Sequence, residues 1–302
     1  MALKAGRGES VTFSKSLTEM LEISKLDAKA LENLIRIAIA EDLNGASDVT
    51  SVATIPEEQF AVAEFWNRKP GVIAGIPVLC AVLEICGITE YEIKKSDGEI
   101  VLTNSLLLVA KGKTQGLLLA ERSALNFIGR LSGIATLTKS WVDEVADTKV
   151  AIRDTRKTTP GLRELEKYAV RMGGGKNHRF SLSDAALIKD NHVLAAGGVA
   201  QAFKLVKDKF PNLPLEVEVD SLQQLREVIE AGADLVLLDN MSIEECRAAV
   251  EIVSGRAKLE ASGGLILSNA HAYAKTGVDY LAVGALTHSA PVLDIGLDLR
   301  ME

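Results

Sequence analysis

The sequence has 302 residues, of which 47% are hydrophobic and 25% charged, so it can bury the core of a soluble protein of about two domains. A net charge of −7 and 4% aromatic residues argue against surfaces for nucleic acid or anionic membranes. Charge-free apolar runs such as residues 71–83 are shorter than the ~18 residues that span a bilayer. Three scattered cysteines form no disulfide framework or zinc knuckle, so we expect a cytoplasmic protein.

The N-terminal part is predicted to contain a polar extension, a helix and a β-rich region. Residues 1–20 lack the apolar segment of a signal peptide and are expected to be polar and partly mobile. Residues 26–40 have the spacing of an amphipathic helix that Asp27 caps. Residues 60–111 contain apolar and β-branched runs separated by turn residues, which predicts a first α+β domain.

A long helical pattern follows over residues 117–146, as one helix or two joined helices. Arg122 lies four residues after Leu118 and three before Leu125, so it shares a helix face with apolar side chains. Such an arginine either extends its guanidinium to the surface or points at an anionic partner. The sequence around it leaves both interpretations open.

From residue 149 onward, short apolar runs alternate with helical patterns. This alternation predicts β–α units and a parallel sheet, in a barrel or open barrel. Thr159 is predicted to cap a helix that begins at Pro160. The predicted strands are residues 150–152, 185–188, 215–219, 235–238, 258–261 and 280–283.

Each of these strands ends in charged residues or in glycine. The carboxyl ends of the strands form the catalytic face of a β/α barrel. Polar residues at a single strand end are common and need no function. Charged residues or glycine at the ends of all six strands favour a functional site. The residues at these ends are Asp154, Thr155, Arg156 and Lys157; Lys189 and Asp190; Glu216, Glu218 and Asp220; Asp239 and Asn240; Ser262, Gly263 and Gly264; and Gly284.

Positive charge is concentrated between residues 153 and 190, where nine Lys/Arg against five Asp/Glu give a local +4, so the rest of the chain carries −11. A basic segment in an acidic chain favours a focused anion site, although a solvated face with uneven lysines fits the charge equally well. Arg156, Lys157, His178 and Arg179 come from one predicted β–α unit. Together they suit a small molecule with several carboxylates or phosphates. The glycines before His178 do not form a dinucleotide fingerprint.

Acidic residues and glycines at the other strand ends suit a sugar phosphate. Glu218 and Asp239 could hold Mg²⁺, bind sugar hydroxyls or stabilise a cationic transition state, or they balance nearby lysines. Gly263 and Gly264, which follow Ser262, and Gly284 let backbone N–H groups approach a phosphate, or serve tight turns. His288 could add a donor or lie at the surface. No GxSxG motif and no cysteine lies near these strand ends, so no nucleophile is predicted.

From about residue 26 to residue 299, these motifs resemble the quinolinate phosphoribosyltransferase family. Small departures are Ala46 and Ser47, where the family often has a tighter Gly-Asp stretch, Met172, where a cysteine is frequent, and the longer N-terminus. The motifs that carry the resemblance are EDLNGASDVTS, AERSALNFIGRLSGIAT, DTRKTTPGLRELEKYAVRMGGGKNHR, DAALIKDNHV, EVEVDS, LLDN, LEASGGL and DYLAVGALTHS.

The resemblance implies an α/β fold with a smaller N-terminal α/β sandwich domain and an open seven-stranded β/α barrel. The first domain would comprise residues 1–131 with the tail 289–302 packed on it, and the barrel residues 132–288. The resemblance also implies a homodimer, or a trimer of such dimers, to which Arg122 contributes across the interface. The implied reaction converts quinolinate and phosphoribosyl pyrophosphate to nicotinate mononucleotide, pyrophosphate and CO₂ in NAD biosynthesis, with Mg²⁺.

The resemblance also implies a role for each site residue. Lys157, Lys189, Glu218 and Asp239 would be catalytic, and the two acids would bind the metal. The substrate-binding set would be Arg122, Thr155, Arg156, Lys157, His178, Arg179, Lys189, Glu218, Asp239, Ser262, Gly263, Gly284 and His288.

Two alternatives remain. The first is a related transferase that acts on nicotinate, or on a sugar pyrophosphate in a molybdenum-linked role. Such an enzyme would not need the full set of carboxylate-binding cations, because nicotinate has only one carboxylate. A non-catalytic anion-binding module would avoid acids such as Glu218 and Asp239.

Overall fold

The computed structural model describes residues 13–301, which group into two compact units. The first unit contains the described residues up to 136 together with 160–173 and 290–301, and the second contains 137–159 and 174–289. Residues 160–173 therefore group with the first unit and not with the barrel, where the sequence analysis placed them. No helix among residues 13–301 is long and apolar enough to cross a membrane.

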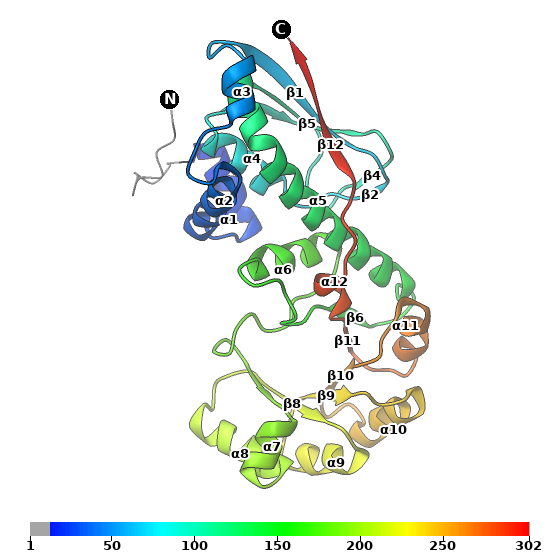
Figure 1. The fold of residues 1–302 in the computed structure, drawn as a ribbon. Coiled ribbons are helices and arrows are strands. Elements are labelled where there is room, and N and C mark those ends of the chain that lie inside the picture. The colour runs from blue at the N-terminus through cyan, green and yellow to red at the C-terminus, as the bar shows by residue number, and fades with distance from the viewer. Residues whose placement is uncertain (1–12, 302) are drawn as a thin grey trace. The chain divides into compact units, whose positions relative to one another are not determined.

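The first unit is built on an antiparallel sheet with strand order β12-β1-β5-β3. The C-terminal strand β12 lies along β1, with Ala61 opposite Met301, so the end of the chain forms one edge of this sheet (Figure 1). The strands are β1 (Phe60–Asn67), β3 (Glu90–Ile93), β5 (Leu106–Lys113) and β12 (Ile295–Met301), with β2 (Gly71–Val72) and β4 (Ile100–Val101) as a separate pair. The helices are α1 (Lys15–Ser24), α2 (Ala28–Leu43), α3 (Val49–Thr54), α4 (Ile76–Ile85), α5 (Thr114–Glu144) and α6 (Arg163–Met172).

The N-terminal segment is more ordered than the sequence analysis predicts. Residues 15–20, expected to be mobile, belong to α1, which buries Leu17 and Leu21. Ser14 caps this helix, and its backbone N–H and hydroxyl donate to the buried carboxylate of Glu84 at 2.8 and 2.6 Å. Residues 1–12 of the expected extension lie outside the described part of the chain.

Four helices follow or correct the predicted pattern. α2 begins after Asp27, which accepts a hydrogen bond from the Ala30 N–H as predicted, and residues 117–146 fall largely in the single helix α5. α4 was missed because all of its residues are buried, and a short apolar run does not separate helix from strand. α6 begins at Arg163 and not at Pro160, because Gly161 has φ +81° and cannot continue a right-handed helix.

The second unit is a parallel sheet with strand order β6-β11-β10-β9-β8-β7. Its strands are β6 (Ala151–Arg153), β7 (Ala186–Ile188), β8 (Leu215–Val219), β9 (Leu235–Asp239), β10 (Lys258–Ser262) and β11 (Tyr280–Ala282). The helices between and after them are α7 (Asp190–Ala196), α8 (Val199–Lys209), α9 (Leu222–Glu230), α10 (Ile243–Val253), α11 (Leu267–Ala274) and α12 (Ala285–His288). All six predicted strands are therefore confirmed, with ends shifted by a residue or less.

The expected seventh strand is not formed in the described chain. In its place a single parallel bridge joins Lys176 to Arg153 at the outer side of β6. The Lys176 N–H donates to the Ile152 carbonyl at 2.8 Å, and the Lys176 carbonyl accepts from the Asp154 N–H at 3.1 Å. Three glycines precede Lys176, and glycine weakens a strand because it loses much conformational freedom and packs no side chain.

Candidate active site

The carboxyl ends of the parallel strands gather the predicted residues of the second unit. In the register of the sheet Glu218 lies beside Leu237, and Asp239 lies beside Ser262. Because parallel strands end at the same edge of a sheet, their last residues and the loops that follow form one surface. The predicted residues at or directly after these ends are Thr155, Arg156, Lys157, Lys189, Glu218, Asp239, Ser262, Gly263, Gly284 and His288.

Arg156 and Arg179 carry positive charge that no ion pair within residues 13–301 neutralises. The Nε atoms of both side chains are buried and have no hydrogen-bond partner. Within residues 13–301 neither guanidinium forms an ion pair, and the Arg179 guanidinium donates only to the Ala185 carbonyl, at 3.1 Å. Burial and the nearby charge of Arg156 lower the pKa of Arg179. Two adjacent cations without a counter-ion form a site that an anion with two charged groups would complete.

The two predicted lysines have different surroundings. Lys189, directly before α7, forms an ion pair with Glu218 of β8. Lys157 is exposed, and its backbone is held on both sides. Its N–H donates to the Thr155 hydroxyl at 3.1 Å, and its carbonyl accepts from the Thr287 hydroxyl at 2.7 Å. Lys157 is thus fixed at its backbone, while its ammonium group remains accessible to a ligand.

Two of the predicted glycines lie where an added Cβ atom would crowd a neighbouring side chain. A Cβ atom on Gly263, which has φ +88°, would lie 2.1 Å from Oδ1 of Asn240. A Cβ on Gly284 would lie 3.1 Å both from Nε2 of His288 and from Cδ of Lys157. Gly284, His288 and Lys157 therefore converge, although they come from different parts of the chain.

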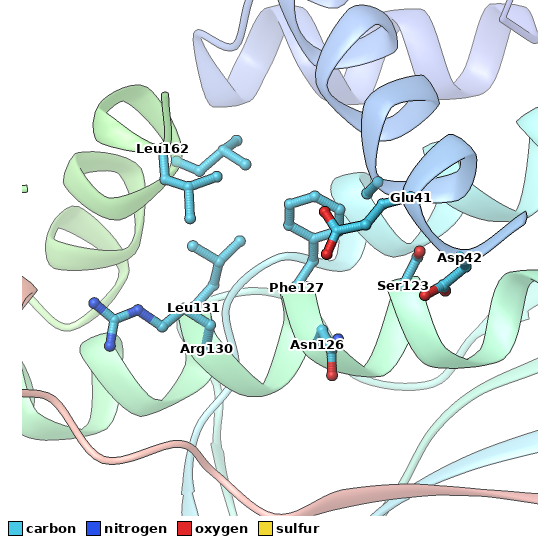
Figure 2. Close-up of a pocket in the computed structure, with 10 residues that line it drawn as sticks. Glu41, Asp42, Ser123, Asn126, Phe127, Arg130, Leu131 and Leu162 are labelled. Atoms are coloured by element: carbon cyan, nitrogen blue, oxygen red, sulfur yellow. The ribbon is translucent and has the colours of Figure 1, made fainter. Parts of the chain in front are cut away.

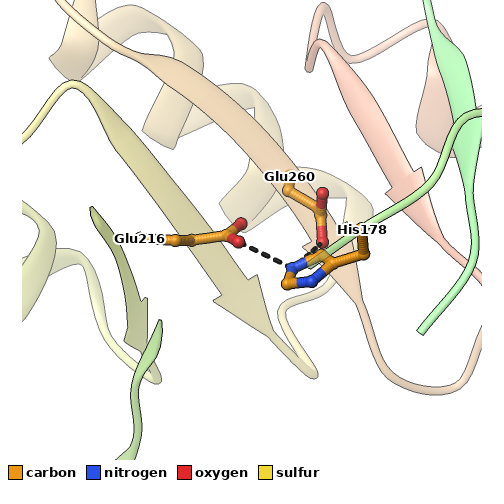
Figure 3. A group of neighbouring side chains, drawn as sticks. All are labelled: His178, Glu216 and Glu260. Atoms are coloured by element: carbon orange, nitrogen blue, oxygen red, sulfur yellow. Dashed lines mark ion pairs between the residues drawn. The ribbon is translucent and has the colours of Figure 1, made fainter. Parts of the chain in front are cut away.

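A buried polar cluster, defined by His178, Glu216 and Glu260, lies within the second unit (Figure 3). The His178 Nε2 atom lies 2.7 Å from Glu216 Oε2 and 3.5 Å from Glu260 Oε1. Glu260 also pairs with Arg153. The Oε1 atoms of both glutamates are buried without a hydrogen-bond partner. Burial and the charge of Glu216 raise the pKa of Glu260 to about 8.

Sequence reasoning assigned no role to Glu216 or Glu260. A signal was nevertheless present, because Glu216 and Glu218 are two residues apart on β8 and Glu260 and Ser262 are two apart on β10. Residues at this spacing lie on the same face of a strand. The buried glutamates therefore lie on the same sheet face as two predicted site residues, one step further from the strand ends.

The arrangement of ligand atoms in the buried polar cluster is compact enough for a metal ion, since they lie within 4.8 Å of one another. The tautomer of His178 argues against a metal. Its Nδ1 accepts a hydrogen bond from the Arg179 N–H at 2.8 Å, so the ring proton of the neutral imidazole lies on Nε2. A protonated Nε2 offers no lone pair to a metal ion.

The first unit has a separate hollow of about 300 Å³ (Figure 2). Glu41 and Asp42 of α2 line it, and none of the predicted site residues does. Arg122 lies on α5 and is exposed, so its role across a subunit interface stays a prediction. The other lining residues are Ala38, Ser123, Asn126, Phe127, Arg130, Leu131, Leu162 and Leu165.

An anion site at the strand ends of an open parallel β/α sheet defines a barrel-type enzyme for phosphorylated or carboxylated substrates. Residues 48–132 match the family model "Quinolinate phosphoribosyl transferase, N-terminal domain", and residues 134–298 match the corresponding C-terminal domain. The chain belongs to the quinolinate phosphoribosyl transferase family, which confirms the resemblance drawn from its motifs.

Similar proteins of known name agree with this membership. The nicotinate-nucleotide pyrophosphorylase (carboxylating) of Mycobacterium leprae is 50% identical over 92% of this chain and 100% of its own. The probable enzyme of the same name from Bacillus subtilis is 40% identical over 90% of this chain and 94% of its own. The structure of the nicotinate-nucleotide pyrophosphorylase from Francisella tularensis superposes with a TM-score of 0.88 at 38% identity, covering 92% of this chain and 99% of that one.

Proposed function

We propose that this protein transfers the phosphoribosyl group of phosphoribosyl pyrophosphate to quinolinate and releases pyrophosphate, CO₂ and nicotinate mononucleotide. The observation that carries the proposal is the pair Arg156 and Arg179, two guanidiniums with buried Nε atoms and no internal counter-ion. Quinolinate is a pyridine with two neighbouring carboxylates. Arginine binds carboxylates through paired N–H donors, so two guanidiniums match this dianion.

The sugar donor fits the remaining strand ends. Gly284, His288 and Lys157 converge, and with Ser262 and Gly263 they would receive the 5′-phosphate. Backbone N–H groups beside glycines and nearby cations are typical of phosphate sites in barrels. Lys157 and Lys189 would lie between the acceptor and the pyrophosphate, and Thr155 would complete the loop that carries Lys157.

The two acids suit the ribose and a magnesium ion. Glu218 and Asp239 are half-buried carboxylates on neighbouring strands. Mg²⁺ prefers oxygen ligands and commonly uses one or two carboxylates together with substrate phosphates, so these residues fit the ion. When bound, Mg²⁺ would neutralise charge on the leaving pyrophosphate. Glu218 and Asp239 would also stabilise the positive charge that develops at the anomeric carbon.

The chemistry then needs orientation and charge from the protein. The ring nitrogen of quinolinate forms a bond to the anomeric carbon as the bond to pyrophosphate breaks. The glycosylated nitrogen is cationic, so it stabilises the electron pair that stays on the ring when the adjacent carboxylate departs as CO₂. A proton then adds to that carbon. Arg156 and Arg179 hold the acceptor in place, and positioning of this kind accounts for a large part of catalysis in bimolecular reactions.

We also propose that the active form is a homodimer in which Arg122 completes the quinolinate site of the second subunit. The support is an exposed arginine on a helix whose neighbouring face is apolar, together with the family. An interface of this kind is isologous, so each dimer would contain two equivalent shared sites.

The proposed function is tested by mixing purified protein with quinolinate, phosphoribosyl pyrophosphate and Mg²⁺ and by measuring nicotinate mononucleotide and CO₂. We expect both products in equal amounts. Quinolinate binding without either product would support the non-catalytic module instead. Omission of Mg²⁺ is expected to remove turnover while quinolinate binding persists.

A further inference from the structure

Asp154 is an aspartate beside the proposed site whose side chain cannot reach a substrate. It directly follows β6 and is fully buried, and it begins the loop that carries Arg156 and Lys157. Burying a carboxylate is costly unless its oxygens accept hydrogen bonds. The partners of these oxygens therefore indicate why an aspartate is present here.

Both carboxylate oxygens of Asp154 hold the segment that leads into Arg179. Oδ1 accepts from the backbone N–H of His178 at 2.8 Å, and Oδ2 accepts from Nδ2 of Asn177 at 2.5 Å. The backbone N–H of Asp154 donates to the Lys176 carbonyl at 3.1 Å. Asp154 thus contacts three consecutive residues directly before Arg179.

The sheet itself holds the backbone of this segment only weakly. Its bridge to β6 is the single pair Lys176 and Arg153, whereas neighbouring strands of the sheet pair over three residues or more. Glycines at residues 173–175 precede the bridge, and glycine leaves the backbone with much conformational freedom. A side-chain anchor therefore has more influence on the position of this segment than it would have on a regular strand.

We propose that Asp154 is a positioning residue that sets the place of Arg179 relative to Arg156. Arg156 follows Asp154 by two residues, and Arg179 follows His178, whose N–H Asp154 accepts, by one. One buried carboxylate therefore joins the two loops that carry the guanidiniums. This inference rests on the proposed function, because it assumes that Arg156 and Arg179 bind the quinolinate carboxylates. It involves only the backbone of His178, whose ring keeps the substrate-binding role that the resemblance implies.

Loss of the anchor is expected to weaken acceptor binding selectively. Asp154→Ala removes both acceptor oxygens, so the KM for quinolinate should rise about tenfold or more. Binding groups must be held to within about 0.5 Å of their productive geometry, and the two guanidiniums would lose their fixed separation. The KM for phosphoribosyl pyrophosphate should stay within about twofold, because the Thr287 hydroxyl holds the backbone of Lys157 independently.

Two further variants separate the position of the side chain from its charge. Asp154→Asn is neutral, but it keeps the length of the side chain and an acceptor oxygen for the His178 N–H. The Asn177 amide can turn to accept from the new NH₂ group, so most of the quinolinate affinity should return. Asp154→Glu keeps the charge but is one methylene longer, and its KM for quinolinate should resemble that of Asp154→Ala.

Amide hydrogen exchange in the free protein tests the anchor without turnover. Exchange of residues 176–179 should become about tenfold faster or more in Asp154→Ala and return toward the wild-type rate in Asp154→Asn, because local opening governs exchange. Asn177→Ala removes only one of the two side-chain anchors and should accelerate exchange less. If Asp154→Ala does not fold, Asn177→Ala and Asp154→Glu still provide the comparison.

Asp279→Ala is the matched control, since Asp279 directly precedes β11 at the amino-terminal end of the same sheet. Its oxygens likewise accept from one backbone N–H, that of Leu259 at 3.0 Å, and from one side-chain nitrogen, that of Lys149 at 3.1 Å. This variant should lower the Tm without changing either KM or the exchange of residues 176–179.

Three results would overturn the proposal: a folded Asp154→Ala protein with the wild-type KM for quinolinate, an equal rise in both KM values, or tighter quinolinate binding by Asp154→Glu than by Asp154→Asn. Unchanged exchange of residues 176–179 in Asp154→Ala would also contradict it. Absence of turnover with quinolinate in the wild-type protein would count against the proposed function instead, whereas exchange in the free protein still decides whether Asp154 anchors the segment.

Discussion

Lys189 and Glu218 form an ion pair across neighbouring strands, at the edge where β7 and β8 end. The pair places a cation and an acid of the proposed site in direct contact before any substrate binds. Phosphoribosyl pyrophosphate would compete with Glu218 for the ammonium group of Lys189. Release of Glu218 toward the ribose would then accompany binding of the sugar donor.

The acids are therefore expected to act on turnover more than on acceptor binding. Glu218→Gln and Asp239→Asn should lower kcat by about a hundredfold or more and change the KM for quinolinate little. The reason is that their charge matters most when the anomeric carbon becomes cationic. Steady-state kinetics with both substrates varied check this. Unchanged kcat with a raised quinolinate KM would place the two acids at the acceptor site instead.

The close fit at Gly263 predicts a selective effect on the sugar donor. Gly263→Ala would place a Cβ 2.1 Å from Asn240 Oδ1 at φ +88°, so the loop must move and the KM for phosphoribosyl pyrophosphate should rise. Gly232→Ala is the control, because Gly232 has φ +92° but open space around it. Both variants should lose about 1 kcal/mol of stability from backbone strain. Equal KM values in the two variants would argue against a phosphate site at Gly263.

Glu260 predicts a pH dependence of stability. Its pKa in the folded protein is raised from 4.5 to about 8 by burial and by Glu216. Between these pH values the folded state binds more protons than the unfolded state, so the free energy of unfolding falls as pH rises. The contribution is fully present below pH 4.5 and is lost as pH passes through 8. The Tm of wild-type protein should decline across this window more steeply than that of Glu260→Gln, and parallel Tm curves would contradict the assignment.

The proposed shared site predicts recovery of activity in mixed dimers. Arg122→Ala and Lys157→Ala should each be nearly inactive, because each removes a cation from every site. In a mixed dimer one site collects both substitutions and the other collects neither. Random reassortment makes about half of the dimers mixed, so roughly a quarter of wild-type activity should return. Co-expression of the two variants with confirmed subunit exchange and no recovery would assign Arg122 to its own chain.

The local pattern of the sequence predicted the strands and the residues at their ends, including Glu218 and Asp239. This prediction succeeded because the spacing of apolar residues, the length of a strand and the polar residues at its end can all be read from residues close together in the sequence. It failed for α4, whose residues are buried on all sides, and for the start of α6, which the positive φ of Gly161 displaces. The contact between His178 and Glu260 joins residues 82 positions apart (260 − 178), and no local pattern predicts it.

Acceptor preference tests most directly whether Arg156 and Arg179 form a site for a dianion. Nicotinate lacks one of the two carboxylates and would leave a buried cation unpaired, which typically costs about 1.5–3 kcal/mol. The ratio of kcat/KM for quinolinate to that for nicotinate is therefore expected to exceed about tenfold. Comparable values of kcat/KM for the two acceptors would contradict the account.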